Sequence, residues 1–139
     1  MAKKRRHLGE ILYKAGLVEK QPLLNAIKTS RANKKRLGQV LLELGLVEEE
    51  TLTKAIAKQF GLEYVDLDGI TIAPEAMKLV PVEVIRRHNV LPMSMNNGRL
   101  KLIISDPLDL EAMDVVRFRL NTELDCCLAN PSKIRTYIR

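Results

Sequence analysis

The chain has 139 residues, of which 46% are hydrophobic by type, and a formal net charge of +6 at pH 7. This hydrophobic share supports a folded core rather than disorder, and the length suits one domain or two small ones. No apolar run approaches the ~20 residues that span a bilayer, and no apolar segment follows the basic residues 1–6. We therefore expect neither membrane insertion nor a secretory signal.

The two cysteines, Cys126 and Cys127, are adjacent. Successive residues of a strand point to opposite faces, so we expect no structural disulfide between them. Reduced cysteines and the missing export signal favour the cytoplasm.

Positive charge is concentrated near the start of the chain. Residues 1–36 contain eleven Lys or Arg and two acidic residues, whereas residues 37–139 contain twelve and fifteen. This asymmetry favours an anionic partner such as a nucleotide, nucleic acid, lipid headgroup or acidic protein face. A solvated helix surface with a basic tail is the alternative, and charge alone does not decide between them.

Residues 7–30 and 36–59 form a tandem repeat of two 24-residue copies separated by the five-residue basic spacer 31–35. Ten positions are identical, where chance predicts one or two. The identical pairs are Leu8/Leu37, Gly9/Gly38, Leu12/Leu41, Gly16/Gly45, Leu17/Leu46, Val18/Val47, Glu19/Glu48, Leu23/Leu52, Ala26/Ala55 and Ile27/Ile56.

Each copy predicts a short helix, a turn at glycine and a second helix. The apolar residues recur at i, i+3 and i+4, and Gly16 and Gly45 occupy the position of a left-handed residue that ends a helix. Pro22 suits the first turn of the second helix. One helix pair cannot bury its apolar face alone, so we expect the two copies to pair into a four-helix module over residues 1–60.

Pairing of the copies explains the leucines and the turn glycines, but two features go beyond it. Gly9 and Gly38 lie near the start of a helix, where glycine costs about 1 kcal/mol and usually permits a close approach to the backbone. Arg36 and Gln59 bracket the second copy with polar groups.

Residues 61–139 predict a small α/β sandwich in the order β-α-α-β-β-α-β-α, giving an α/β (α+β) fold overall. The Asn97-Gly98 turn is a strong hairpin signal, and Asn130 and Pro131 predict the start of a last helix. The expected elements are a strand at 63–67, helices at 74–79 and 81–88, strands at 90–95 and 100–105, a helix at 108–120, a strand at 123–129 and a final helix.

Sequence signals for catalysis are missing. No Gly-rich loop ends in Gly-Lys-Ser/Thr, two distant histidines and two adjacent cysteines lack zinc spacing, and no nucleophile–histidine–acid set is present. We expect that this chain is not itself an enzyme and that it holds no metal.

The repeat resembles the tandem MshEN-type motif in the N-terminal domain of type II secretion and type IV pilus assembly ATPases. The resemblance rests on Arg36-Leu37-Gly38, an apolar pair, Gly45-Leu46-Val47 and the later Leu, Ile and Gln. Residues 81–88, Val90-Leu91-Pro92, 100–105 and Asp106-Pro107 extend it, less specifically, to the second half. In this family the 24-5-24 arrangement binds cyclic di-GMP, one motif for each guanylate half.

The resemblance also implies the ligand-binding residues. In the second motif they are Arg36, Leu37, Gly38, Leu41, Gly45, Leu52, Ile56 and Gln59. In the first they are His7, Leu8, Gly9, Leu12, Gly16, Leu23 and Ile27, with Arg6 or Arg5 as a substitute for the arginine that His7 replaces. Ser30 stands where glutamine is usual. Asp106 is a further candidate for a guanine contact, with a turn or helix cap as its alternative role.

These residue types suit the ligand. An arginine can pair with guanine O6 and N7 or stack on the ring, and glycine lets backbone N–H groups reach a phosphate. The leucines supply dry contact for the bases, and the glutamine amide both donates and accepts.

We therefore expect a cytoplasmic domain, peripheral to an inner-membrane machine, that binds cyclic di-GMP and couples it to a secretion or pilus motor. ATP and magnesium would belong to an ATPase core expected after residue 139. The alternative is a docking domain that tethers the ATPase to the inner-membrane platform protein, with a degenerate, non-binding repeat. Nucleic acid is disfavoured as a partner, because aromatic residues are few and tryptophan is missing.

Overall fold

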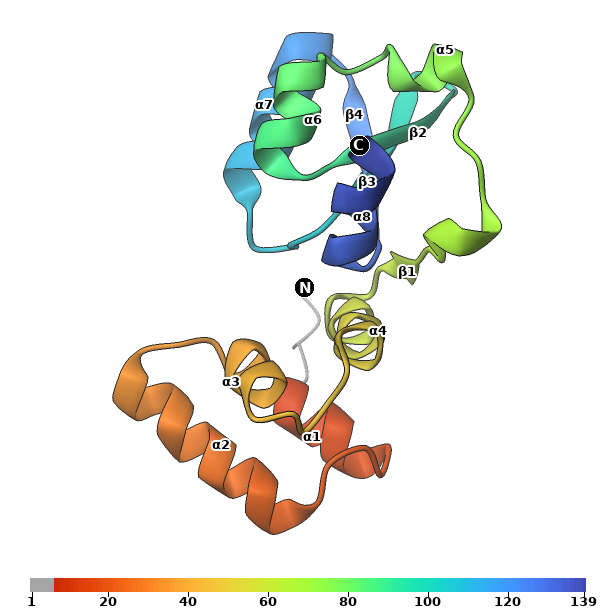
Figure 1. Ribbon diagram of the computed structural model, residues 1–139. Helices are drawn as coiled ribbons and strands as arrows, with labels where there is room; N and C mark the ends of the chain where they lie inside the picture. Colours follow the sequence, from red (N-terminus) through yellow and green to blue (C-terminus); the bar gives the residue numbers. More distant parts are fainter. Residues whose placement is uncertain (1–6) are drawn as a thin grey trace. The chain divides into compact units, whose positions relative to one another are not determined.

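The computed structural model describes residues 7–139 (Figure 1). Its chain packing divides into two compact units, Met1–Gly61 and Leu62–Arg139. The first unit is helical, and the second combines a four-stranded sheet with helices. The expected α/β class with a helical first part is confirmed. In the described part of the chain, no helix combines the length and the hydropathy that crossing a membrane requires.

The first unit contains four helices: α1 Leu8–Lys14, α2 Lys20–Asn33, α3 Leu37–Glu43 and α4 Glu49–Phe60. The expected left-handed glycines follow the first helix of each copy, with φ of +74° at Gly16 and +69° at Gly45. After α1, Gly16 N–H donates to Tyr13 O and Leu17 N–H to Leu12 O, both at 3.0 Å. These bonds satisfy carbonyls that a helix end leaves without partners. The second copy repeats the same pair of bonds.

The two copies share one hydrophobic core. It is formed by apolar side chains of all four helices and of the turn after α1, namely Ile11, Leu12, Val18, Leu23, Ala26, Val40, Leu41 and Ala55. Helix α2 packs against α3, and α1 packs against α4. Each copy therefore buries its apolar face on the other, as the repeat predicts.

The second unit is built around a sheet of order β1-β4-β3-β2. Strands β2 (Leu91–Asn96) and β3 (Arg99–Ile104) are antiparallel, whereas β4 (Glu123–Leu128) pairs in parallel with β3 and with β1 (Glu63–Tyr64). Asn97 and Gly98 form the predicted hairpin turn, with φ of +52° and +75°.

Helices α5 (Pro74–Met77), α6 (Val82–His88), α7 (Leu110–Leu120) and α8 (Pro131–Ile138) complete this unit. Helices α6 and α7 lie side by side (Figure 1). Asn130 begins α8 as expected, because its Oδ1 accepts from the N–H groups of Ser132 (2.9 Å) and Lys133 (3.4 Å).

The strand expected at residues 63–67 is shorter than predicted. Pairing with β4 covers Glu63–Tyr64, and one more bond follows from Val65 N–H to Leu128 O at 2.8 Å. Asp66 then accepts from Asp68 N–H at 3.0 Å and starts the 3-10 helix Leu67–Gly69. The local carboxylate turn replaces the ladder bonds that the alternating pattern had suggested.

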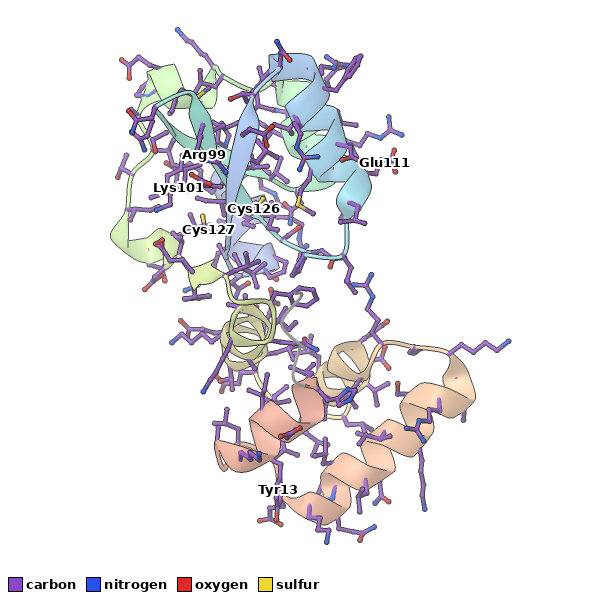
Figure 2. The ribbon with its side chains drawn as sticks, turned by 180° about the vertical axis from the view of Figure 1, so that it is seen from behind. Tyr13, Arg99, Lys101, Glu111, Cys126 and Cys127 are labelled. Atoms are coloured by element: carbon purple, nitrogen blue, oxygen red, sulfur yellow. The ribbon has the colours of Figure 1, made fainter. Side chains whose placement is uncertain are left out.

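The two adjacent cysteines of β4 lie on opposite faces of the sheet. Figure 2 shows Arg99 and Lys101 on β3 and the adjacent cysteines on β4. Cys126 Sγ lies 3.6 Å from Sδ of Met113, so its face is covered by α7, whereas Cys127, on the other face, is 1% exposed. Both are free thiols, as the alternation along a strand predicts.

Candidate functional site

A groove in the first unit gathers much of the first motif. Its volume is about 680 Å³, within the ~300–1,000 Å³ typical of small-molecule sites. The residues that line it are His7, Leu8, Gly9, Glu10, Tyr13, Lys20, Leu23, Leu24, Ile27, Ser30, Arg31 and Leu37.

The apolar part of the groove lining comes from both copies. Leu8 begins α1, Leu23 and Ile27 lie one turn apart on α2, and Leu37 begins α3. Leu8, Ile27 and Leu37 are half-buried at the edge of the shared core, so part of each side chain remains available. Such a surface can take the flat, apolar face of an aromatic ring.

Polar and charged groups also line the groove. His7 precedes α1, Lys20 begins α2, and Ser30 and Arg31 lie in the last turns of α2. Tyr13 projects from α1 (Figure 2) and is 49% exposed. The groove is therefore lined by apolar side chains together with hydrogen-bonding groups, two basic side chains and one carboxylate.

Ser30 has a local structural role. Its hydroxyl donates to the carbonyl oxygen of Lys35 at 2.6 Å, while its own carbonyl accepts from Lys35 N–H at 3.0 Å. Lys34, between them, ends α2 in the left-handed conformation. The hydroxyl donor of Ser30 is thus engaged in the turn that the spacer 31–35 forms after α2.

Gly9 and Gly38 have a packing explanation. A Cβ added to Gly9 would lie 3.4 Å from Leu23 Cδ1 and 3.5 Å from Leu37 Cδ2. At Gly38 the corresponding neighbours are Leu52 Cδ2 at 3.2 Å and Leu8 Cδ2 at 3.7 Å. The groups that approach these two backbones are therefore leucine side chains, from the same copy and from the other one.

Other motif positions are set back from the groove. Leu12 and Leu41 are 0% exposed in the core, and Leu52 is 5% exposed beneath Gly38. Gly16 and Gly45 are exposed in the turns. These positions shape the repeat.

In the second motif the polar ends lie at helix boundaries. Arg36 precedes α3 with extended backbone and is exposed, and Gln59 lies next to the last residue of α4 and is half-buried. Ile56 is half-buried one turn before Gln59. The groove described above includes Leu37 of this copy but none of these three residues.

Asp106 belongs to the second unit and forms a turn. Its Oδ1 accepts from Leu108 N–H at 2.9 Å, directly before α7. This is the local role that an Asp-Pro pair predicts. Arg5 and Arg6, the expected substitutes for His7, lie outside the residues that the structure describes.

Sequence reasoning missed five residues of the groove. Glu10, Tyr13, Lys20, Leu24 and Arg31 differ from their counterparts in the second copy, so a search for shared positions passes over them. The basic surplus of residues 1–36 was the signal that could have pointed to Lys20 and Arg31. Within residues 7–139, no cluster of His, Cys, Asp and Glu could hold a metal ion.

Comparison with known proteins gives a family. A model of the MshEN domain matches residues 60–139. The type IV pilus assembly ATPase PilB of Myxococcus xanthus is 31% identical over 131 residues, which cover 94% of this chain and 23% of that protein. PilB of Pseudomonas aeruginosa is 26% identical over 127 residues, covering 91% of this chain and 22% of the relative.

Solved structures agree with these relatives. The structure of MshE with cyclic di-GMP matches with a TM-score of 0.83 and 27% identity, covering 96% of this chain and 97% of that one. The N-terminal domain of XpsE matches with a TM-score of 0.72 and 25% identity, covering 99% and 96%.

The chain belongs to the MshEN domain family. It is similar to part of the type IV pilus assembly ATPase PilB and to the N-terminal domain of XpsE, in agreement with the resemblance in its sequence. It spans less than a quarter of the length of the PilB relatives. The family model matches the second unit, whereas sequence reasoning had expected the tandem repeat to be the more specific part.

Proposed function

We propose that the tandem repeat binds cyclic di-GMP, with one copy for each guanylate half. The observation that carries this proposal is the groove, because five of the residues implied by the first motif line it together with Leu37 of the second. The structure of MshE with cyclic di-GMP, a protein of the same fold, supports the choice of ligand.

In this proposal both copies supply apolar contacts to the bases, and the polar contacts at the second copy come from the two ends of its motif. Leu8, Ile27, Leu37 and Ile56 offer half-buried carbon surface to the bases, and Arg36 and Gln59 bind the guanine edge at the second copy. Leu12, Leu41, Leu52, Gly16 and Gly45 act by holding the two helix pairs in place, because they are buried or lie in turns.

We further propose that binding is coupled to a motor. The ATPase core, with its ATP and magnesium, would follow residue 139, and the domain would work in the cytoplasm at the inner-membrane platform of a pilus or secretion machine. The similarity to PilB supports the motor assignment. Asp106 remains a candidate guanine contact in this proposal.

Calorimetry with cyclic di-GMP tests this function. Arg36→Ala and Gln59→Ala should each weaken binding, because losing a bidentate guanine contact costs ~1–3 kcal/mol. Lys58→Ala removes an exposed positive charge beside Gln59 and should change affinity little. A wild-type protein without detectable binding at tens of micromolar (~10⁻⁵ M, about −7 kcal/mol) would refute the proposal.

Docking to the platform protein is the second candidate, and one observation favours it. On α7 the side chains of Phe118 and Leu110 are 89% and 65% exposed, which suits anchoring in an apolar pocket of a partner. Phe118→Ala should abolish binding to the platform's cytoplasmic region without changing cyclic di-GMP affinity. If Phe118→Ala binds the platform as the wild type does, this docking face is wrong.

A further inference from the structure

The two copies of the repeat differ most at the polar ends of the motif. The second copy begins with Arg36 and ends with Gln59, whereas the first begins with His7 and ends with Ser30. His7 carries an imidazole ring where the second copy has a guanidinium fork, and the hydroxyl of Ser30 is engaged by Lys35. The polar ends of the first motif therefore offer a ligand no guanidinium and no spare hydroxyl donor.

Arg31, one residue beyond the motif, lies in the same groove. It follows Leu24 and Ile27 by seven and four residues on α2, so the three share a helix face. Its side chain is exposed, and within residues 7–139 it makes no hydrogen bond or ion pair. The corresponding residue of the second copy is Phe60, so this cation belongs to the first copy alone.

We infer that Arg31 is the guanine-binding residue of the first half-site and replaces the arginine that the motif has lost at His7. This inference rests on the proposed binding of cyclic di-GMP. The guanidinium fork matches the O6 and N7 acceptors of guanine, while Leu8, Ile27 and Leu37 contact the ring. Both half-sites then bind guanine through arginine, but from opposite ends of the motif.

Calorimetric titration with cyclic di-GMP separates this inference from the proposed function. Arg31→Ala should weaken binding about tenfold or more, and Arg31→Lys should lose nearly as much, because an ammonium lacks the fork. Lys28→Ala is the matched control: it removes one exposed positive charge from the same helix without lining the groove, and we expect less than a twofold change.

A guanidinium introduced at position 7 should restore affinity that is lost in Arg31→Ala. His7→Arg should tighten binding more in the Arg31→Ala background than in the wild type, because in the wild type the half-site already has its arginine. We expect circular dichroism to show that each variant is folded, because Arg31 is exposed and lies outside the core.

The outcomes are distinct. If the wild type does not bind cyclic di-GMP, the proposed function fails. If the wild type binds and Arg31→Ala is within twofold of it, or no weaker than Lys28→Ala, the inference about Arg31 is wrong while the function stands. If Arg31→Lys binds with wild-type affinity, a positive charge alone accounts for the role of Arg31, and the inference that its guanidinium binds guanine is wrong.

Discussion

Replacing Gly45 by alanine should destabilise the helical unit through the backbone alone. Gly45 has φ of +69°, and no heavy atom of the described chain beyond its immediate neighbours lies within 4 Å of the position that a Cβ would occupy. A left-handed conformation costs an L-residue roughly 1–2 kcal/mol. Alanine recovers about 0.4–1 kcal/mol by reducing the freedom of the unfolded chain, so we expect a net loss of about 1 kcal/mol.

Urea denaturation followed by circular dichroism measures this loss. Gly16→Ala changes the same turn of the first copy, where φ is +74° and the space is equally open, and should lose the same amount. Gly69→Ala is the control, because its Cβ position is also open but its φ is outside the left-handed range. Gly45→Asn should recover part of the loss, since asparagine tolerates this conformation better.

The comparison has a clear failing outcome. If Gly45→Ala is as stable as Gly69→Ala, backbone conformation does not explain this glycine. A direct role in binding would then be the better account of its place in the motif.

Three further outcomes follow from other parts of the molecule. Burial raises the pKa of the Cys127 thiol to about 12, above the ~8.5 of an exposed thiol, so ionisation favours the unfolded chain as pH rises from about 9 towards 12. Stability measured in urea should fall across that range by up to ~1.4 kcal/mol per pH unit more in the wild type than in Cys127→Ala, and equal slopes would contradict the buried thiol. Asn130→Ala should cost about 1–2 kcal/mol in the same assay, because two N–H groups of α8 lose their acceptor; a loss no larger than that of Asn33→Ala, at an exposed helical position, would count against the cap. His7→Arg should bind cyclic di-GMP with an affinity within about threefold of the wild type in calorimetry, because Arg31 already supplies a guanidinium to the proposed first half-site, and a gain of about tenfold or more would show that His7 limits this half-site.

Local sequence signals predicted the element boundaries well. Gly16 and Gly45 follow helix ends, Asn97-Gly98 forms the hairpin turn, and Asn130 starts the last helix, because each acts through its own backbone or its nearest neighbours. The strand expected up to Leu67 was too long, since Asp66 makes a local turn that competes with pairing. Local competition of this kind depends on geometry that an alternating pattern does not carry.

The candidate site was harder to predict from sequence. Comparing the two copies selects what they share, which is mostly the core and the turns. The groove also contains Tyr13, Lys20 and Arg31, which the two copies do not share, and these residues come together only when α1, α2 and the start of α3 are assembled. The packing role of Gly9 and Gly38 could not be predicted either, because the leucines that approach them come from other helices.

The contacts at these two glycines exchange partners between the copies: Leu37 approaches Gly9, and Leu8 approaches Gly38. Leu8 and Leu37 also line the groove. In the proposed site each of these leucines would contact the ligand while it also packs against the first helix of the other copy. Ligand binding would then strengthen the packing of all four helices, so cyclic di-GMP should raise the unfolding temperature of both copies in a single transition.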